Sequence, residues 1–349
     1  MARRKPTMDD VARRANVAVG TVSNVLGGQV KVSDQRRGRV LRAIAALNYE
    51  PNVHAQRLRR RRSNVVGLCF PHVSTAYLNA LSETLEDIAA RNGYSVLHVF
   101  SRHEPATELV RVKELIKHGV DGLFLFPSAA PARTLDLAHR SRLPVVMVDR
   151  PTDDDRFDHV VVDNRKAMRK TAEHLIALGH TRLLFVSRSR TRLVTRHRRE
   201  GLMAARRNAT AAIDVRSIEY GDDEANVAIE LTAFMRGTLP PTAIIASNSH
   251  QASLVLTTLR ALGLRCPGDV SVVAFDDPDW AMLVDAPLSV IRQPAATIAQ
   301  TAWELMMRRL RSRASPVHNV LLEAEIDFRA SVGAPPRAAR PARGSKLAA

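Results

Sequence analysis

The feature that most constrains the fold of this chain is an alternation of short apolar runs and amphipathic stretches from about residue 64 onward. Short apolar runs bounded by turn residues are typical of buried strands, whereas apolar residues three or four positions apart are typical of helices. The expected strands are 65–70, 95–100, 122–126, 145–149, 160–163, 183–187, 217–220, 243–247 and 270–276. The expected helices include 80–91, 109–118, 168–178 and 253–262. This alternation predicts an α/β fold with parallel sheets covered by helices, and its length predicts two lobes.

Positive charge is concentrated at the two ends of the chain. The formal net charge is +17 at pH 7, and residues 1–62 hold 15 Lys and Arg against 4 Asp and Glu. Residues 333–349 hold 4 basic residues and no acidic ones, whereas the long middle is nearly neutral. A basic N-terminal segment indicates a module that binds a polyanion, and charge alone leaves DNA, RNA and an anionic membrane open.

Other features argue against several classes of protein. No apolar run is long enough to span a bilayer, and no apolar segment follows the N-terminal basic residues, so we expect a cytoplasmic protein. Cys69 and Cys266 lie far apart, which predicts reduced thiols and neither a disulfide nor a metal site. The sequence contains no G-x-S-x-G, P-loop, G-x-G-x-x-G or H-E-x-x-H motif, so we expect neither an enzyme nor a bound cofactor.

The segment MDDVARRANVAVGTVSNVL fits a helix-turn-helix. Residues 7–47 predict three short helices, of which Thr7 caps the first and Ser33 caps the third, 34–47. Ala12 is small enough for close helix contact, and Asn16 tolerates the left-handed backbone of a tight turn. The positions expected to form an apolar core are Val11, Ala15, Val17, Val22 and Val25.

The second helix, at about 19–26, is the segment expected to enter the major groove. Its outward positions are Val19, Gly20, Thr21, Ser23 and Asn24. Asn can bond adenine through two hydrogen bonds, whereas Thr and Ser more often hold phosphate. Each polar residue taken singly is equally typical of a solvated helix, but the whole pattern beside a basic flank predicts DNA binding.

Several motifs in a fixed order resemble the lactose-repressor (LacI/GalR) family of bacterial regulators over roughly residues 5–332. They are TMDDVARRANVAVGTVSNVL, ALNYEPN, HAQRL, PVVMVDRP, VVVDN, HLIALGHTRLLFV, the R-x-x-G of Arg198 to Gly201, GDVSVVAFDD and LSVIRQP. The resemblance implies a helix-turn-helix head at 1–50, a hinge helix at 51–62 and a two-lobed core at 63–332 that is similar to periplasmic binding proteins. The N-terminal lobe would hold about 63–163 and 294–321, and the C-terminal lobe about 164–293 and 322–332. Residues 333–349 predict a disordered basic tail.

The resemblance also implies a homodimer that represses transcription by binding pseudo-palindromic double-stranded operator DNA at the bacterial nucleoid. Leu58 of the hinge would wedge into the minor groove at the operator centre, where it would kink the duplex. Asn52 would cap the hinge helix and Arg57 would meet phosphate, while Thr7 joins the contacts of the head. Without the resemblance, Leu58 is an isolated apolar residue among arginines and is typical of a loose linker.

Polar residues at the carboxyl ends of the expected strands are ligand candidates from the sequence alone, because open α/β sheets bind ligands there. They are His72, Ser101, Asp149, Asn248 and Asp276. The resemblance adds Arg198, Arg192, Tyr77 and Leu78 as contacts of a small effector, a sugar or related metabolite. Asp276 has an alternative role as the cap of the turn that follows its strand.

Some segments depart from the family pattern and leave the effector open. Ser247-Asn248-Ser249 stands where the family has A-N-D, and residues 72–76 replace D-x-S-N-P. The segment RSRTRLVTRHRR predicts a strongly basic loop, which suits either solvent or an anionic effector. Competing functions are an activator, a regulator that answers a protein co-effector, and a periplasmic sugar-binding protein without a DNA role.

Overall fold

The computed structural model describes residues 6–27, 32–49, 62–71, 75–188, 192–221, 223–312 and 314–336. The chain divides into two compact units, residues 1–63 and residues 64–349. None of the helices in these described ranges is both long and apolar enough to cross a membrane. The expected hinge residues Asn52, Arg57 and Leu58, together with His72 and the tail from 337, lie outside the described residues.

In its described residues, the N-terminal unit, here called the head, contains three helices: α1 (Met8–Ala15), α2 (Val19–Gly27) and α3 (Asp34–Leu47). Thr7 begins α1 with a capping box, in which the Thr7 amide donates to Asp10 Oδ2 at 2.9 Å and the Asp10 amide donates to Thr7 Oγ1 at 3.4 Å. Asn16 ends α1 in the left-handed conformation, with φ 49°, as expected. Ser33 precedes α3, but its side chain makes no cap hydrogen bond. The expected Ser33 cap is therefore wrong; this side chain is exposed, so water can satisfy the first amides of α3.

The core of the head is small and apolar. Its buried residues are Val11, Ala12, Ala15, Val22, Val40, Ala43 and Tyr49. Val17 and Val25 are partly buried and pack against this cluster, as their spacing predicts. Three short helices can form a stable unit because each contributes one apolar stripe to a shared centre.

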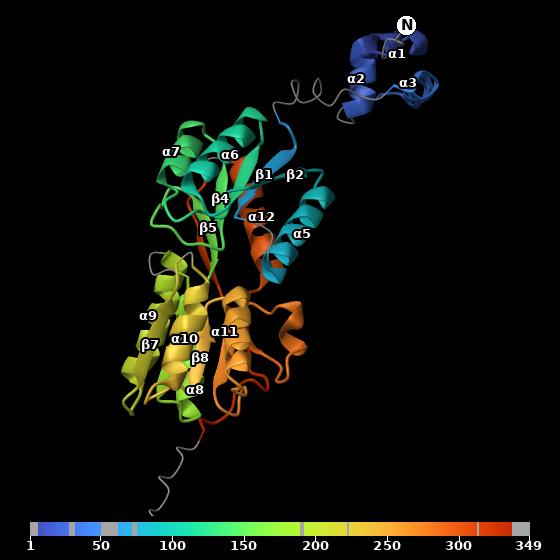
Figure 1. Cartoon of the computed structure of the whole chain (residues 1–349). Helices are drawn as coiled ribbons and strands as arrows, with labels where there is room; N and C mark the ends of the chain where they lie inside the picture. The colour runs from blue at the N-terminus through green and yellow to red at the C-terminus, as the bar shows by residue number, and fades with distance from the viewer. Residues whose placement is uncertain are drawn as a thin grey trace, which may run out of the picture. The chain divides into compact units, whose positions relative to one another are not determined.

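The N-terminal lobe of the core is a parallel six-stranded sheet in the order β11-β5-β4-β3-β1-β2. The strands are β1 (Val65–Phe70), β2 (Ser95–Phe100), β3 (Gly122–Leu125), β4 (Val145–Val148), β5 (Asp158–Val162) and β11 (Asn319–Leu322). Its helices are α5 (Ala76–Arg91), α6 (Pro105–Lys117), α7 (Ala132–Arg140) and α12 (Ala295–Arg311). α5 and α12 cover one face of the sheet, and α6 and α7 cover the other (Figure 1).

The C-terminal lobe repeats this plan with the order β12-β10-β9-β8-β6-β7. The strands are β6 (Arg182–Ser187), β7 (Asp214–Glu219), β8 (Ala243–Ala246), β9 (Ser271–Phe275), β10 (Ser289–Arg292) and β12 (Glu325–Asp327), of which β12 is antiparallel to β10. The helices are α8 (Asn164–Ala177), α9 (Leu193–Asn208), α10 (Ala225–Arg236), α11 (Ser249–Ala261) and the short 3₁₀ helix η1 (Asp279–Met282). The predicted α/β fold of two lobes is confirmed.

The chain passes between the lobes three times in its described part. The first crossing is at Asp163, between β5 and α8; the second is at Gln293 and Pro294, between β10 and α12; the third joins β11 to β12 at residues 323–324. β11 reaches Leu322, which pairs with Val162, so the third crossing lies slightly later than the sequence suggested. Short crossings at the same edge of both sheets place the carboxyl ends of their strands opposite each other.

The expectation of a basic loop over residues 188–199 is wrong from Leu193 onward, because α9 begins there. The residues that α9 buries follow a helical spacing: Thr195, Arg198, Gly201, Leu202 and Ala205. The many arginines between them hide this pattern in the sequence, because only two of the buried side chains are plainly apolar. Strands β10, β11 and β12 were also missed, since none of them is a continuous apolar run.

Candidate functional site

The exposed surface of α2 in the head carries most of the residues expected to read DNA. Gly20 and Asn24 are exposed, and Thr21 and Ser23 are half-buried. Val19 is also half-buried and packs against the core of the head. The expectation that Val19 points fully outward is therefore only partly met, because the first turn of α2 needs an apolar contact to dock on the rest of the head.

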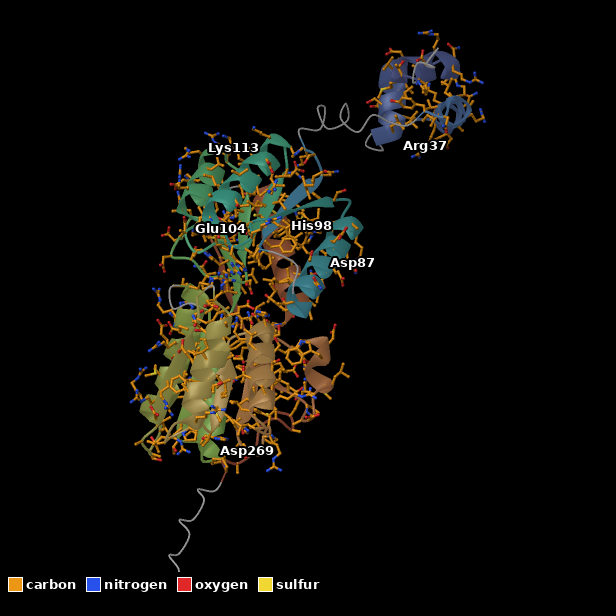
Figure 2. All side chains as sticks on the ribbon, in the orientation of Figure 1. Arg37, Asp87, His98, Glu104, Lys113 and Asp269 are labelled. Carbon is orange, nitrogen blue, oxygen red and sulfur yellow. The ribbon has the colours of Figure 1, made fainter. Side chains whose placement is uncertain are left out.

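The neighbouring helices of the head carry exposed basic side chains. Arg13 and Arg14 at the end of α1 are exposed, as are Arg36 and Arg37 in the first turn of α3. Arg37 projects from the head in Figure 2. Exposed guanidinium groups near a helix with an exposed Asn have the chemistry of a module that holds phosphates and reads base edges.

A cavity of about 560 Å³ lies between the two lobes of the core. Seven of the residues that line it are the effector contacts expected from sequence: Tyr77, Leu78, Asp149, Arg192, Arg198, Asn248 and Asp276. Ser101 is fully buried and is not among the lining residues. The structure thus brings together side chains that are up to about 200 positions apart in the sequence.

The acidic residues Asp149 and Asp276 occupy equivalent positions in the two lobes. Asp149 follows β4 and Asp276 follows β9, the third strand of each sheet from the same side. Both have a left-handed backbone, with φ 69° and 67°, which Asp tolerates better than most residues. Burial raises the pKa of Asp276 to about 6, against the opposing effects of a hydrogen bond from Gln293 and the charge of Arg198. That bond, from Gln293 Nε2 to Asp276 Oδ1, is 2.7 Å long.

Arg198 is a buried cation at the centre of the cavity wall, with 6% of its surface exposed. Its Nε donates to Asn164 Oδ1 at 2.7 Å, its Nη1 donates to the carbonyl of Ser247, and its guanidinium lies 3.4 Å from the ring centroid of Phe275. Burial lowers its pKa to about 10, so it stays charged at neutral pH. Among the described residues, no carboxylate lies within ion-pair distance of it. A ligand oxygen is therefore a suitable partner for the guanidinium edge that the protein leaves open.

Gly201 explains the R-x-x-G motif in physical terms. A Cβ at Gly201 would lie 2.2 Å from the carbonyl oxygen of Arg165 in α8, closer than real side chains allow. The missing side chain lets α9 approach the start of α8. This approach brings Arg198, one turn earlier in α9, within hydrogen-bond reach of Asn164.

The N-terminal lobe supplies an aromatic wall from the first turn of α5. Thr75 begins this helix, and its Oγ1 accepts the Leu78 amide at 3.2 Å, which fixes Tyr77 and Leu78 at the cavity. Burial raises the pKa of Tyr77 well above its usual value, and the charge of Asp149 adds to this effect. The Tyr77 hydroxyl is buried close to the Asp149 carboxylate but makes no hydrogen bond of good geometry within the described part of the chain, so it can donate to a ligand.

Asn248 has a structural role beside its place at the cavity. Its Oδ1 accepts the Gln251 amide at 3.0 Å and caps α11. Its Nδ2 can donate to a ligand, and its Oδ1 keeps one lone pair. Asp276, by contrast, accepts from Gln293, and none of the described hydrogen bonds joins it to the turn that follows β9.

Several cavity residues were missed by the sequence analysis, notably Gln293, Arg150 and Tyr220. Arg150 lies beside Asp149, with Nε 3.7 Å from Asp149 Oδ2. The Tyr220 hydroxyl accepts a hydrogen bond from Gln251 Nε2. Gln293 and Tyr220 also follow strands at their carboxyl ends, which is the signal that could have found them. Because strand β10 was not predicted, Gln293 was not identified as a residue at the end of a strand.

The chemistry of the cavity is that of a binding site for a polar molecule. It combines carboxylates, guanidinium groups, amides and a buried hydroxyl, which together can donate to and accept from several hydroxyl groups at once. A DNA-reading head and such a cavity on one chain define the class of ligand-responsive DNA-binding regulators.

Comparisons with known proteins agree with this class. Residues 7–52 match the family of bacterial regulatory proteins of the lacI family, and residues 172–332 match the periplasmic binding protein-like domain. The transcriptional regulator KdgR of Bacillus subtilis is 26% identical over 332 residues, which cover 93% of this chain and 97% of KdgR. Catabolite control protein A of Staphylococcus xylosus is 27% identical over 323 residues, with 93% and 98% covered.

A solved structure of the lac repressor dimer bound to operator and an anti-inducer has the same fold. It superposes with a TM-score of 0.83 at 24% identity, covering 95% of this chain and 100% of the other. A complex of the regulator CelR with cellobiose gives a TM-score of 0.68 at 24% identity, with 94% and 100% covered. Residues 7–52 thus match the lacI family model, and nearly the whole chain is similar to DNA-binding transcriptional regulators such as KdgR.

Proposed function

We propose that this regulator is a homodimeric repressor whose affinity for operator DNA is controlled by a small polar metabolite, of the sugar class, in the cavity between the lobes. The observation that carries the proposal is the cavity itself, where Asp149 of one lobe and Arg198 and Asp276 of the other line one space. CelR, a regulator of the same fold, is described in complex with cellobiose, which supports a sugar. The chain would act in the cytoplasm, at the nucleoid, and without catalysing a reaction.

The proposed mechanism is a change in the angle between the lobes. A ligand that contacts both lobes favours the arrangement in which those contacts are best, and it can shift the equilibrium only by its differential affinity. The expected hinge at 51–62 joins the head to the N-terminal lobe, so a changed lobe arrangement in a dimer would change how two heads meet two half-sites. Coupling of this kind typically amounts to about 1–3 kcal/mol and is reciprocal.

The DNA part of the proposal is tested by selecting sites for the full-length protein from random double-stranded DNA. One head reads only a few base pairs, so we expect a pseudo-palindrome with half-sites about one helical turn apart. Asn24→Ala should cost about 1–3 kcal/mol and relax the preference at one base pair in each half-site. An unchanged site for this variant, or full affinity from a monomer in sedimentation, would contradict the proposal.

The effector part is tested with Arg198→Ala and a matched control, Arg199→Ala. Arg199 is the next residue in α9, pairs with Glu219 at 3.2 Å and does not line the cavity. A panel of mono- and disaccharides is first screened for ligands that change the affinity of the wild type for its selected DNA site. Arg198→Ala should lose that response and still select the same DNA site without ligand, while Arg199→Ala should keep both the response and the wild-type affinity. A full response in Arg198→Ala would place the effector site elsewhere.

A further inference from the structure

The buried amide of Asn164 joins the cavity to the first crossing between the lobes. Asn164 is the first residue of α8, directly after the crossing at Asp163, and only 2% of its surface is exposed. Its Nδ2 donates to the carbonyl of Val162 at 3.0 Å, and its Oδ1 accepts from Arg198 Nε at 2.7 Å. One side chain thus binds the last residue of an N-terminal-lobe strand and a cavity residue of the C-terminal lobe.

The other hydrogen bonds at this crossing make the connection stiff. Asp163 Oδ1 accepts the Lys166 amide at 3.0 Å and fixes the start of α8. The close approach of α9 at Gly201 holds Arg198 against the same turn of α8. A displacement of the Arg198 guanidinium therefore moves Asn164 directly, because no flexible segment lies between them.

Arg198 remains free to respond to a ligand on one edge only. Its Nε is held by Asn164 and its Nη1 by the Ser247 carbonyl. No acceptor for Nη2 is found in the part of the chain that the structure describes. A ligand that binds Nη2 would displace the Arg198 guanidinium, whose Nε is bonded to Asn164 at the crossing.

The second crossing has a parallel arrangement. Gln293, between β10 and α12, donates from Nε2 to Asp276 Oδ1 at 2.7 Å. Arg198 and Asp276, two buried charged side chains that the C-terminal lobe contributes to the cavity lining, are therefore each bonded to an amide at a crossing. A hydrogen bond between an amide at the crossing and a charged cavity residue occurs at both crossings, which argues against a chance contact at either one.

We propose that Asn164 is a positioning residue that couples the Arg198 guanidinium to the first crossing and so sets the preferred angle between the lobes. The inference rests on the proposed function only where it takes Arg198 to be a ligand contact. If Asn164 only filled space at the start of α8, the volume of its side chain would matter and its two hydrogen bonds would not.

The test measures the distance between the lobes in the full-length protein without ligand or DNA. Spin labels are attached at Lys113→Cys in α6 and Arg207→Cys in α9, both exposed, in a background where Cys69 and Cys266 are replaced by Ala. Lys113 lies on the outer surface of the N-terminal lobe (Figure 2). Pulsed electron paramagnetic resonance then gives the distribution of distances between the two labels.

The variants Asn164→Ala and Asn164→Asp should both broaden or shift this distribution. Asn164→Asp keeps the volume and the acceptor for Arg198 but loses the donor to Val162, so a space-filling role would leave the distances unchanged. The matched control is Asn92→Ala, which removes a similar bond, from Asn92 Nδ2 to the Ile88 carbonyl at 2.8 Å, at the end of α5. This control should leave the distribution as it is.

Arg198→Ala should change the distribution in the same way as Asn164→Ala, and the double variant should change it no further, because the two residues act through one bond. Circular dichroism checks that each variant is folded. Unchanged distances in both Asn164 variants, or additive effects in the double variant, would overturn the inference. Such a result would not affect the proposed function, whose tests use DNA and sugars.

Discussion

Replacing Gly201 by Ala tests the close approach of α8 and α9 on which the cavity depends. The new Cβ would lie 2.2 Å from the Arg165 carbonyl oxygen, so the two helices must separate by about 1 Å to reach ordinary contact. Overpacking of this kind costs about 1–3 kcal/mol, while Ala in a helix gains up to about 1 kcal/mol over Gly. Because the contact is with backbone, which cannot rotate away, we expect the free energy of unfolding to fall by about 1–2 kcal/mol.

Urea unfolding followed by tryptophan fluorescence measures this loss in the core alone, since both tryptophans, Trp280 and Trp303, lie there. The matched control is Gly38→Ala in α3 of the head, where the new Cβ would meet only Arg42 Nη1 at 3.9 Å. This control should raise the stability of the head by about 0.5–1 kcal/mol and leave the tryptophan transition unchanged. A Gly201→Ala protein as stable as the wild type would refute the argument from close approach.

Two further predictions concern the cavity and the hinge. Burial holds the pKa of Asp276 at about 6, above the ordinary 3.8, so the folded state binds more protons than the unfolded state between these values. The ionisation of Asp276 therefore lowers the free energy of unfolding by at most about 3 kcal/mol as pH rises from about 4 to 6. Asp276→Asn should remove this pH dependence from urea unfolding measured across that range. The same pH dependence in the wild type and the variant would contradict the prediction. Leu58→Ala should reduce operator bending and specific affinity while sparing binding to random DNA, because a wedge acts only where the duplex is kinked. Gel mobility of permuted sites measures the bending. Equal losses on operator and random DNA would contradict the wedge role.

The fold was predictable because its signals are local. Strand β1 and helix α3 have the bounds that the sequence suggested, since continuous apolar runs and the helical spacing of buried residues do not depend on distant contacts. Thr7 and Asn16 were predictable for the same reason: a capping box and a left-handed turn residue act within four positions. The missed α9 shows the limit, because its buried face includes Arg198 and Gly201, which only tertiary contacts make suitable for a core.

The residues of the cavity were predictable as a set, but their bonds were not. The rule that ligands bind at the carboxyl ends of parallel strands led to Asp149, Asn248 and Asp276. No local pattern indicates that Asn164 bonds Arg198 or that Gln293 bonds Asp276, because each bond joins residues from different elements. Whether these residues bind a ligand stays a prediction for the variants proposed above.

The two lobes repeat one strand plan, and this repetition places one carboxylate from each lobe at the cavity. In each sheet the third strand ends in an Asp with a left-handed backbone, so the parallel architecture delivers two carboxylates to one space. These two carboxylates repel each other, and the charge of Asp149 is one of the causes that raise the pKa of the buried Asp276. Arg198 lowers that pKa, and it is the side chain whose position depends on Asn164. A change in the angle between the lobes would alter the distances among these three charges, and a bound ligand would alter their solvation. Ligand binding and lobe angle are therefore linked through the same electrostatic interactions, which is the physical basis expected of a regulator that answers a small molecule.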